Sequence, residues 1–221
     1  METLLAVIEE LYLLNKRFTL ERIQRVWETY RRWMNPHMMD GGYSLTLGEF
    51  LYIVEVSSAT DIVEARRLFD RMKVFTPTNG REQMDLLEFL LTFTVLCRGS
   101  WEKKCQFMFH LMDLDIEDEI SESELAMLIT IVCDGLRKFR VLEWMPSLQD
   151  VMPMAARGFL HNEIGYGSKM NFNQFLNWCV FHADPQNLLD YISQMLRLPT
   201  RPRATLAIGR GTIAFRLGRK H

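Results

Sequence analysis

The stretch DLDIEDEISESE, residues 113–124, holds seven acidic side chains in twelve positions. Acids alternate with apolar residues at its start, an isoleucine stands eighth and a glutamate stands twelfth. Residues 102–112 before it and 125–139 after it repeat apolar side chains every three or four positions, which predicts a helix on each side. This succession of helix, acidic turn and helix decides the fold that we expect.

The acidic turn has the spacing of a calcium-binding loop. Such a loop takes oxygen ligands from positions 1, 3, 5, 7, 9 and 12, and a backbone carbonyl supplies the seventh. Counting back from the last glutamate, the candidate metal ligands are Asp113, Asp115, Glu117, Glu119, Ser121 and Glu124. Repulsion among these acids in the empty loop favours a divalent cation. The alternative is an acidic, solvated turn between two helices.

Two positions of this loop depart from the usual calcium-binding pattern. Position 6 is normally glycine because the chain turns there with positive φ, and this chain has Asp118. A non-glycine residue in that conformation costs on the order of 1 kcal/mol. Position 5 is Glu117, which is one methylene longer than the usual Asp or Asn. Both departures predict calcium binding no tighter than that of a sensor protein.

A short pattern recurs four times along the chain. In each copy an apolar anchor is followed four residues later by Glu or Gln, and then by Phe or Leu; the anchors are Leu45, Met84, Ile120 and Met170. Each copy predicts one helix-loop-helix unit. The longest gap separates the third and fourth anchors, and its segment 138–154 contains Pro146 and Pro153. We expect a bent linker or a kinked helix there.

The other three loops lack the ligands that calcium needs. The first, counted back from Glu49, keeps only Asp40 as a carboxylate before its glycines. The second, which ends at Glu88, has Arg81 at position 5, where a positive charge repels a cation. The fourth has Gln174 at position 12, and a neutral amide cannot serve as the bidentate carboxylate. We therefore expect calcium as the cofactor, with at most one ion bound.

With these residues together, the chain resembles the EF-hand proteins of the calmodulin superfamily, with four hands of which three are degenerate. RGSWEKKCQFMFHLMDLD, from Arg98, is similar to the segment that enters the third hand in neuronal calcium sensors and in calaxin-like ciliary proteins. The resemblance implies an all-α fold with two lobes of paired EF-hands. Calaxin-like membership would imply attachment to the outer dynein arm docking machinery of the axoneme, and calcium control of ciliary beating.

The expected domains follow from the four units and from a change of composition near the end of the chain. They are an N-terminal lobe with two degenerate hands (1–99), a C-terminal lobe with hands three and four (100–183), an extra amphipathic helix (184–198) and a basic tail (199–221). The whole chain has a formal net charge of −2, whereas its last 21 residues hold six basic side chains and no acid.

The extra helix is the candidate partner-binding segment. One face of it carries five apolar side chains, Leu188, Leu189, Ile192, Met195 and Leu196. This face either plugs the groove of the C-terminal lobe, which we prefer for the free protein, or pairs with a partner. The tail is either a disordered segment or an electrostatic strap onto an acidic surface, such as a microtubule or an acidic coiled coil.

The sequence also favours some functional classes over others. It has no nucleotide-binding or hydrolase motif, and its five histidines form no constellation, so we expect a protein that is not an enzyme and has no small-molecule substrate. We expect no nucleic-acid partner and no membrane anchor. Four scattered cysteines indicate reduced thiols in a cytoplasmic or ciliary protein. We prefer an adaptor that grips a helical segment of a protein partner, and the alternative is a calcium-switch sensor of a soluble or channel target.

Overall fold

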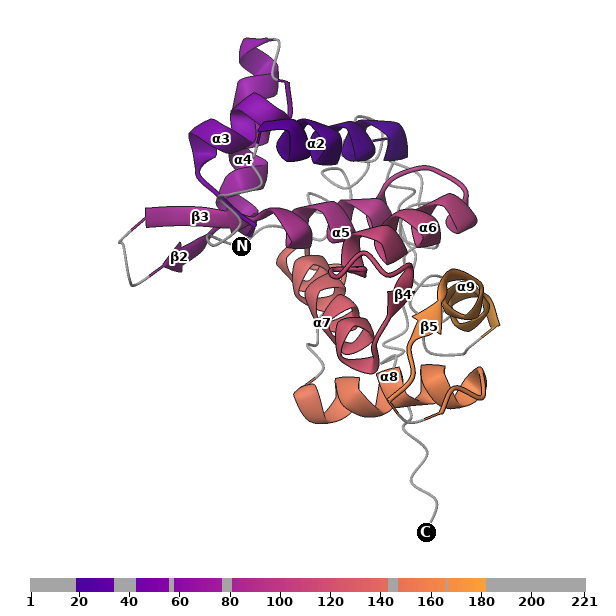
Figure 1. Ribbon diagram of the computed structural model, residues 1–221. Helices are drawn as coiled ribbons and strands as arrows, with labels where there is room; N and C mark the ends of the chain where they lie inside the picture. Colours follow the sequence, from indigo (N-terminus) through magenta and orange to yellow (C-terminus); the bar gives the residue numbers. More distant parts are fainter. Residues whose placement is uncertain are drawn as a thin grey trace, which may run out of the picture.

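The computed structural model describes residues 19–33, 43–55, 58–76, 81–142, 147–165 and 167–181. Helices dominate this part of the chain, and its strands are short (Figure 1). The all-α class expected from the sequence is confirmed. Within the described residues, no helix combines the length and the apolar character needed to cross a membrane.

A pair of antiparallel strands, one from each loop, joins the first two helix-loop-helix units. Their elements are α2 (Leu20–Trp33), β1 (Ser44–Leu45), α3 (Leu47–Ile53), α4 (Ala59–Met72), β2 (Val74–Thr76), β3 (Arg81–Asp85) and α5 (Leu86–Leu96). Strands β1 and β3 are antiparallel, with Leu45 opposite Met84. Both side chains are almost fully buried. The first two apolar anchors of the repeat therefore join the first two loops.

The third and fourth units are joined in the same way. Their elements are α6 (Trp101–Met112), β4 (Glu119–Ile120), α7 (Glu122–Lys138), α8 (Leu148–His161), β5 (Met170–Asn171) and α9 (Phe172–Phe181). Strands β4 and β5 are antiparallel, and Ile120 lies opposite Met170, both of them buried. The remaining two anchors thus connect the third loop to the fourth.

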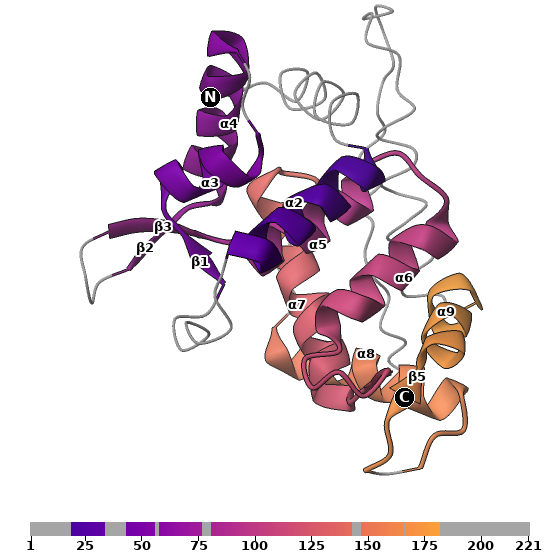
Figure 2. The ribbon, with the colours of Figure 1, turned by 45° about the horizontal axis from the view of Figure 1, so that its top comes forward.

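Helix α5 is the central element of the described structure, between α2 on one side and α7 on the other (Figures 1 and 2). Every side chain from Leu86 to Leu96 is buried. Where α7 crosses α5, Gly135 faces Thr92 so closely that an added Cβ would lie 1.7 Å from the threonine hydroxyl oxygen. The absence of a side chain at Gly135 therefore lets the third unit pack closely against the second.

A row of aromatic rings continues the core across the two halves. Phe50 of α3 contacts Phe89 of α5 edge to face at 5.2 Å between ring centroids, and Phe89 lies 4.6 Å from Phe93. Phe93 in turn meets Phe139, just after α7, at 5.4 Å. Each fully buried ring stabilises the fold by about 1.5–3 kcal/mol. The two pairs of units therefore share one hydrophobic core.

Part of the segment between the third and fourth units is helical, as the second alternative of our prediction allowed. Of the predicted linker 138–154, the part from Leu148 onward belongs to α8, with Pro153 inside the helix. Proline cannot donate a backbone hydrogen bond, and Pro153 is the sixth residue of α8, beyond the first turn where this costs nothing, so the helix forms despite the loss of one bond. The first turn has a favourable N-terminus, because the backbone N–H of Ser147 donates to Asp150 at 3.0 Å.

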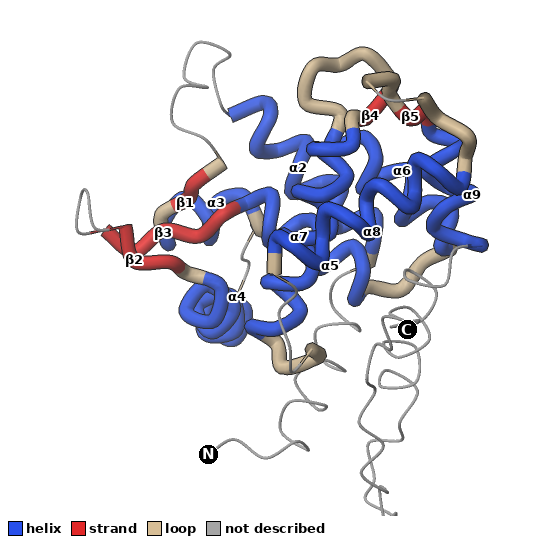
Figure 3. Tube along the Cα trace, turned by 90° about the horizontal axis from the view of Figure 1, so that it is seen from below, coloured by secondary structure: helices blue, strands red, loops and turns tan. Residues whose placement is uncertain are grey.

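The second unit carries a hairpin that the repeat did not predict. Strand β2 pairs with β3 in antiparallel register, with Val74 opposite Gln83 (Figure 3). Lys73, just before β2, binds Asp70 at 3.0 Å and Glu82 at 2.8 Å. The predicted extra helix 184–198 and the tail 199–221 lie outside the described residues.

Candidate metal centre

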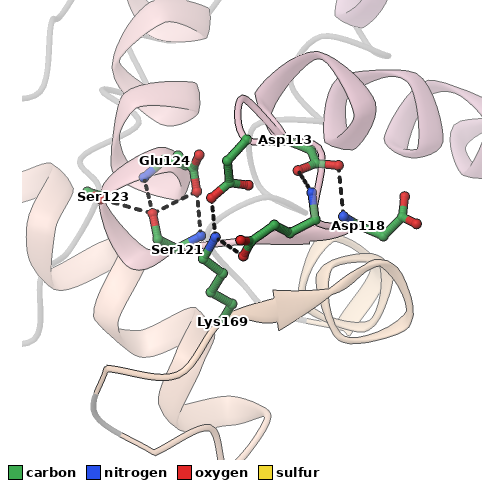
Figure 4. A network of polar contacts seen from close by, with 8 residues as sticks. Asp113, Asp118, Ser121, Ser123, Glu124 and Lys169 are labelled. Atoms are coloured by element: carbon green, nitrogen blue, oxygen red, sulfur yellow. Dashed lines mark hydrogen bonds and ion pairs between the residues drawn. The ribbon is translucent and has the colours of Figure 1, made fainter.

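The acidic loop 113–124 connects α6 to α7 and lies beside the loop that precedes β5 (Figure 4). It begins at Asp113, the C-terminal cap of α6, and ends in the first turn of α7, whose N-terminal cap is Ser121. Of the six candidate ligands, five make hydrogen bonds within the protein through their side chains. These contacts decide what the loop can bind.

Asp113, the candidate ligand at position 1, holds the backbone of its own loop. One carboxylate oxygen accepts the N–H of Glu117 and the other accepts the N–H of Asp118, both at 3.0 Å. The residue is only 8% exposed. Both carboxylate oxygens of Asp113 thus accept backbone amides of the turn, and these bonds stabilise the conformation of the loop.

The turn itself is strained at two residues. Asp118 has φ of 59°, so position 6 adopts the left-handed conformation that the calcium-loop pattern implies, without the usual glycine. Ile116 has φ of 60° although it is β-branched, and its side chain is 82% exposed. Such conformations cost of order 1–3 kcal/mol each, and surrounding contacts must enforce them. The hydrogen bonds to Asp113 supply part of that enforcement.

A lysine from the fourth unit, which is not among the predicted site residues, enters this loop. The ammonium of Lys169 donates to one carboxylate oxygen of Asp115 and, at 2.7 Å, to one of Glu117 (Figure 4). These are the candidate ligands at positions 3 and 5. The two hydrogen bonds raise the pKa of Lys169 above its ordinary value, and the bond from Lys169 lowers the pKa of Asp115.

The remaining candidate ligands belong to the start of α7. One Glu124 oxygen accepts both the N–H and the hydroxyl of Ser121 at 2.7 Å, and the Glu124 N–H donates back to the Ser121 hydroxyl at 3.2 Å. This reciprocal arrangement is a capping box, which satisfies amides at a helix N-terminus. The Glu119 side chain is exposed, while its backbone lies in β4, paired with Asn171.

Two of the degenerate loops use the same box. In the first, Glu49 accepts the N–H of Thr46 at 2.7 Å, and in the fourth, Gln174 accepts the N–H of Asn171 at 3.0 Å. Positions 9 and 12 of three loops are therefore helix caps. A cap needs an acceptor at position 12, and an amide provides one as well as a carboxylate does.

Glu88, at position 12 of the second loop, has a different partner. Its carboxylate binds Lys138 at the end of α7, with the ammonium 2.6 Å from one oxygen. Both side chains are buried or nearly so, and the lysine also donates to the carbonyl of Met72 at 3.2 Å. Burial raises the pKa of Glu88 from 4.5 to about 7, and the hydrogen bond from Lys138 opposes that rise. A residue at a ligand position thus ties the second unit to the third.

The oxygen-rich donor set of loop 113–124 suits calcium by its chemistry. In this structure the candidate ligand oxygens do not surround a common point, because they bind backbone amides of the loop, Lys169 and the N-terminal cap of α7. Among the residues that the structure describes, no three His, Cys, Asp or Glu side chains converge in a way that could hold a metal. The five predicted partner-binding residues of the extra helix lie outside the described ranges.

Comparison with known proteins gives two distant relatives, and no family model matches the chain. A recoverin family protein of Dictyostelium discoideum is 25% identical over 128 residues, which cover 52% of this chain and 54% of that protein. Calcineurin B type 1 of the same organism, which is one of the subunits of calcineurin, is 25% identical over 143 residues, covering 62% of this chain and 68% of that relative. The chain thus spans about half the length of the first relative.

The relatives agree with the geometry described above. Paired helix-loop-helix units, apolar anchors joined across short strands and a twelve-residue acidic loop occur together in this chain. Taken with the two similarities, they make the chain similar to EF-hand calcium-binding proteins.

Proposed function

We propose that this protein is a non-catalytic EF-hand adaptor, whose calcium-sensor-like frame holds a helical segment of a protein partner without requiring calcium. The observation that carries the proposal is the buried ion pair between Glu88 and Lys138, because it joins the two halves of the frame from inside. In a calcium-switched protein, the ion supplies the order that such contacts supply here.

Neighbouring contacts strengthen the same junction. The Arg71 guanidinium donates to the carbonyl of Lys138 at 3.4 Å and lies 5.6 Å from the ring centroid of Phe139. Together with the shared aromatic core, these bonds make a preassembled body. A preassembled surface binds a partner at a lower entropic cost than one that must first be ordered.

Exposed apolar side chains of the first two units are candidates for the partner contact. Tyr52 of α3 is 64% exposed, and its ring is tilted by 47° against that of Trp33, at the end of α2, with ring centroids 6.3 Å apart. Ile62 and Val63 are exposed near the start of α4. Aromatic and branched apolar residues of this kind receive the apolar face of an amphipathic helix. Large aromatic side chains also contribute strongly to binding energy.

The relatives support an adaptor in a limited way. One of them is, by its name, a component of calcineurin, and a component of this kind works within an assembly. By extension, we propose that this chain binds a helical segment of a protein partner.

The finer assignment rests on the resemblance in sequence alone. We propose the ciliary axoneme as the place of action and the dynein-docking coiled coil, or another microtubule-associated complex, as the partner. A cytoplasmic location outside cilia belongs to the alternative, a calcium-switch sensor of a soluble or channel target.

The test is affinity capture from ciliated cells with the tagged full-length chain, in calcium and in chelator. An adaptor of the proposed kind recovers the same partner in both conditions, and Tyr52→Asp reduces the recovery. Glu28→Lys, on the exposed face of α2, is a control for a surface change elsewhere and keeps the recovery. Recovery that requires calcium would contradict the proposal and favour the sensor.

A further inference from the structure

We infer that Lys169 is an internal cation that takes the place of calcium between positions 3 and 5 of loop 113–124. Its ammonium contacts the carboxylates of both Asp115 and Glu117, the side chains that would face an ion at those positions (Figure 4). These residues are separated from Lys169 by more than 50 positions in sequence, so the contact depends on the tertiary fold.

The pairing of the two loops delivers the lysine. Met170, the next residue, lies opposite Ile120 in the β4–β5 pair, and both side chains are buried. Because Met170 is fixed in the core, the backbone of Lys169 lies next to loop 113–124. Its side chain is 25% exposed, which is less than that of either carboxylate it binds. The ammonium of Lys169, in the fourth unit, therefore points into loop 113–124 of the third unit.

The charges of the two loops favour this arrangement. The third loop has seven acids and no base, and Lys169 is the one base among residues 163–174 of the fourth loop. An ammonium donates up to three hydrogen bonds and carries one positive charge, so it neutralises part of the acidic loop. Because it is covalently attached, its effective concentration at the site is fixed and does not vary with calcium.

Calcium that enters the loop must displace this ammonium. The displacement breaks two ion pairs, whereas the backbone at Asp118 is already in the left-handed conformation that a bound ion needs. The third hand is thereby ordered without the ion, and its calcium affinity is lowered by a residue of the fourth hand. Lys138 at Glu88 gives the second loop a comparable internal partner.

Calcium titration calorimetry of the full chain tests the inference. Lys169→Met keeps most of the apolar stem and removes the charge, and Lys103→Met makes the same change at an exposed position of α6. We expect Lys169→Met to bind one calcium ion about ten-fold more tightly than the unchanged chain, since each exposed ion pair opposes the ion by a small amount. We expect Lys103→Met to leave the affinity unchanged.

An equal or weaker affinity of Lys169→Met would overturn the inference, and so would an equal gain in Lys103→Met. Thermal unfolding in chelator gives a second readout. Lys169→Met lowers the midpoint there, and calcium restores it. If this variant is unfolded in chelator, refolding on addition of calcium supports the inference and failure to refold counts against it. Neither experiment involves a partner, so its outcome is separate from that of the proposed adaptor function.

Discussion

Replacing Lys138 by Met removes the positive charge that faces the buried carboxylate of Glu88. The methionine keeps most of the apolar stem, so the main change is electrostatic. Losing one member of a buried pair costs about 3–5 kcal/mol, because the other charge stays in a poorly solvated place. Here the loss in the free energy of unfolding should be smaller, about 1–2 kcal/mol at pH 8, because Glu88, whose pKa is already about 7, can take up a proton once Lys138 is gone.

The direction of the pH dependence follows from the pKa of Glu88. Its folded value is raised from 4.5 to about 7, so the folded protein binds this proton more tightly than the unfolded chain does. Stability linked to Glu88 is therefore gained as the pH falls from about 7 toward 4.5. The pKa is raised even though Lys138 lies beside the carboxylate, so removing Lys138 should raise the pKa of Glu88 further.

Urea denaturation followed by tryptophan fluorescence at pH 8 and at pH 5 measures this effect. The loss caused by Lys138→Met should be large at pH 8 and much smaller at pH 5, where Glu88 is neutral in the folded protein. The double variant Lys138→Met with Glu88→Gln should recover part of the loss at pH 8. An equal loss at both pH values, with no recovery in the double variant, would refute the electrostatic account of this junction.

Two further predictions concern the backbone. Gly135→Ala should destabilise the protein by about 1–3 kcal/mol in urea denaturation, because the added methyl group meets Thr92. Gly48→Ala, where a Cβ meets nothing within 4 Å, is the helical control and should be neutral or stabilising, and a similar loss in both variants would contradict the argument. Asp118→Gly should raise the thermal midpoint in chelator, because glycine relieves about 1 kcal/mol of strain at φ of 59°. An unchanged or lower midpoint would show that the side chain of Asp118 compensates for its backbone.

The parts of the fold that follow from local pattern were predictable. The anchors Leu45, Met84, Ile120 and Met170 repeat at fixed offsets from a helix start, and hydrophobic burial makes such positions recognisable in a single sequence. The strand pairs that join the loops lie at these same anchors. The all-α class and the position of the acidic loop could both be predicted for this reason.

Contacts between distant residues were not predictable in the same way. Lys169 and Lys138 each look like an ordinary surface lysine in the sequence, and their roles arise only when the tertiary fold brings carboxylates to them. Once Ile120 is aligned with Met170, the single base in the fourth loop is a usable signal, because it falls beside the third loop. For segment 138–154, the two prolines led us to expect a bent linker or a kinked helix, and the structure has a helix, α8, that continues through Pro153.

The candidate ligands were chosen by spacing, and spacing cannot distinguish a ligand from a cap. Ser121 and Glu124 suit both roles, since each needs an oxygen three residues from the other at the start of a helix. Asp113 likewise accepts backbone amides in the arrangement seen here. Whether calcium binds in addition stays a prediction for these residues.

Amide hydrogen exchange of residues 113–124 and 169–171 in chelator, compared with calcium, tests the central claim most directly. The claim is that internal contacts, and not calcium, order the paired third and fourth hands. We predict that the amides of Glu117, Asp118 and the β4–β5 pair are already protected in chelator, and that calcium changes their exchange little. Unprotected amides in chelator that become protected only when calcium is added would contradict the account.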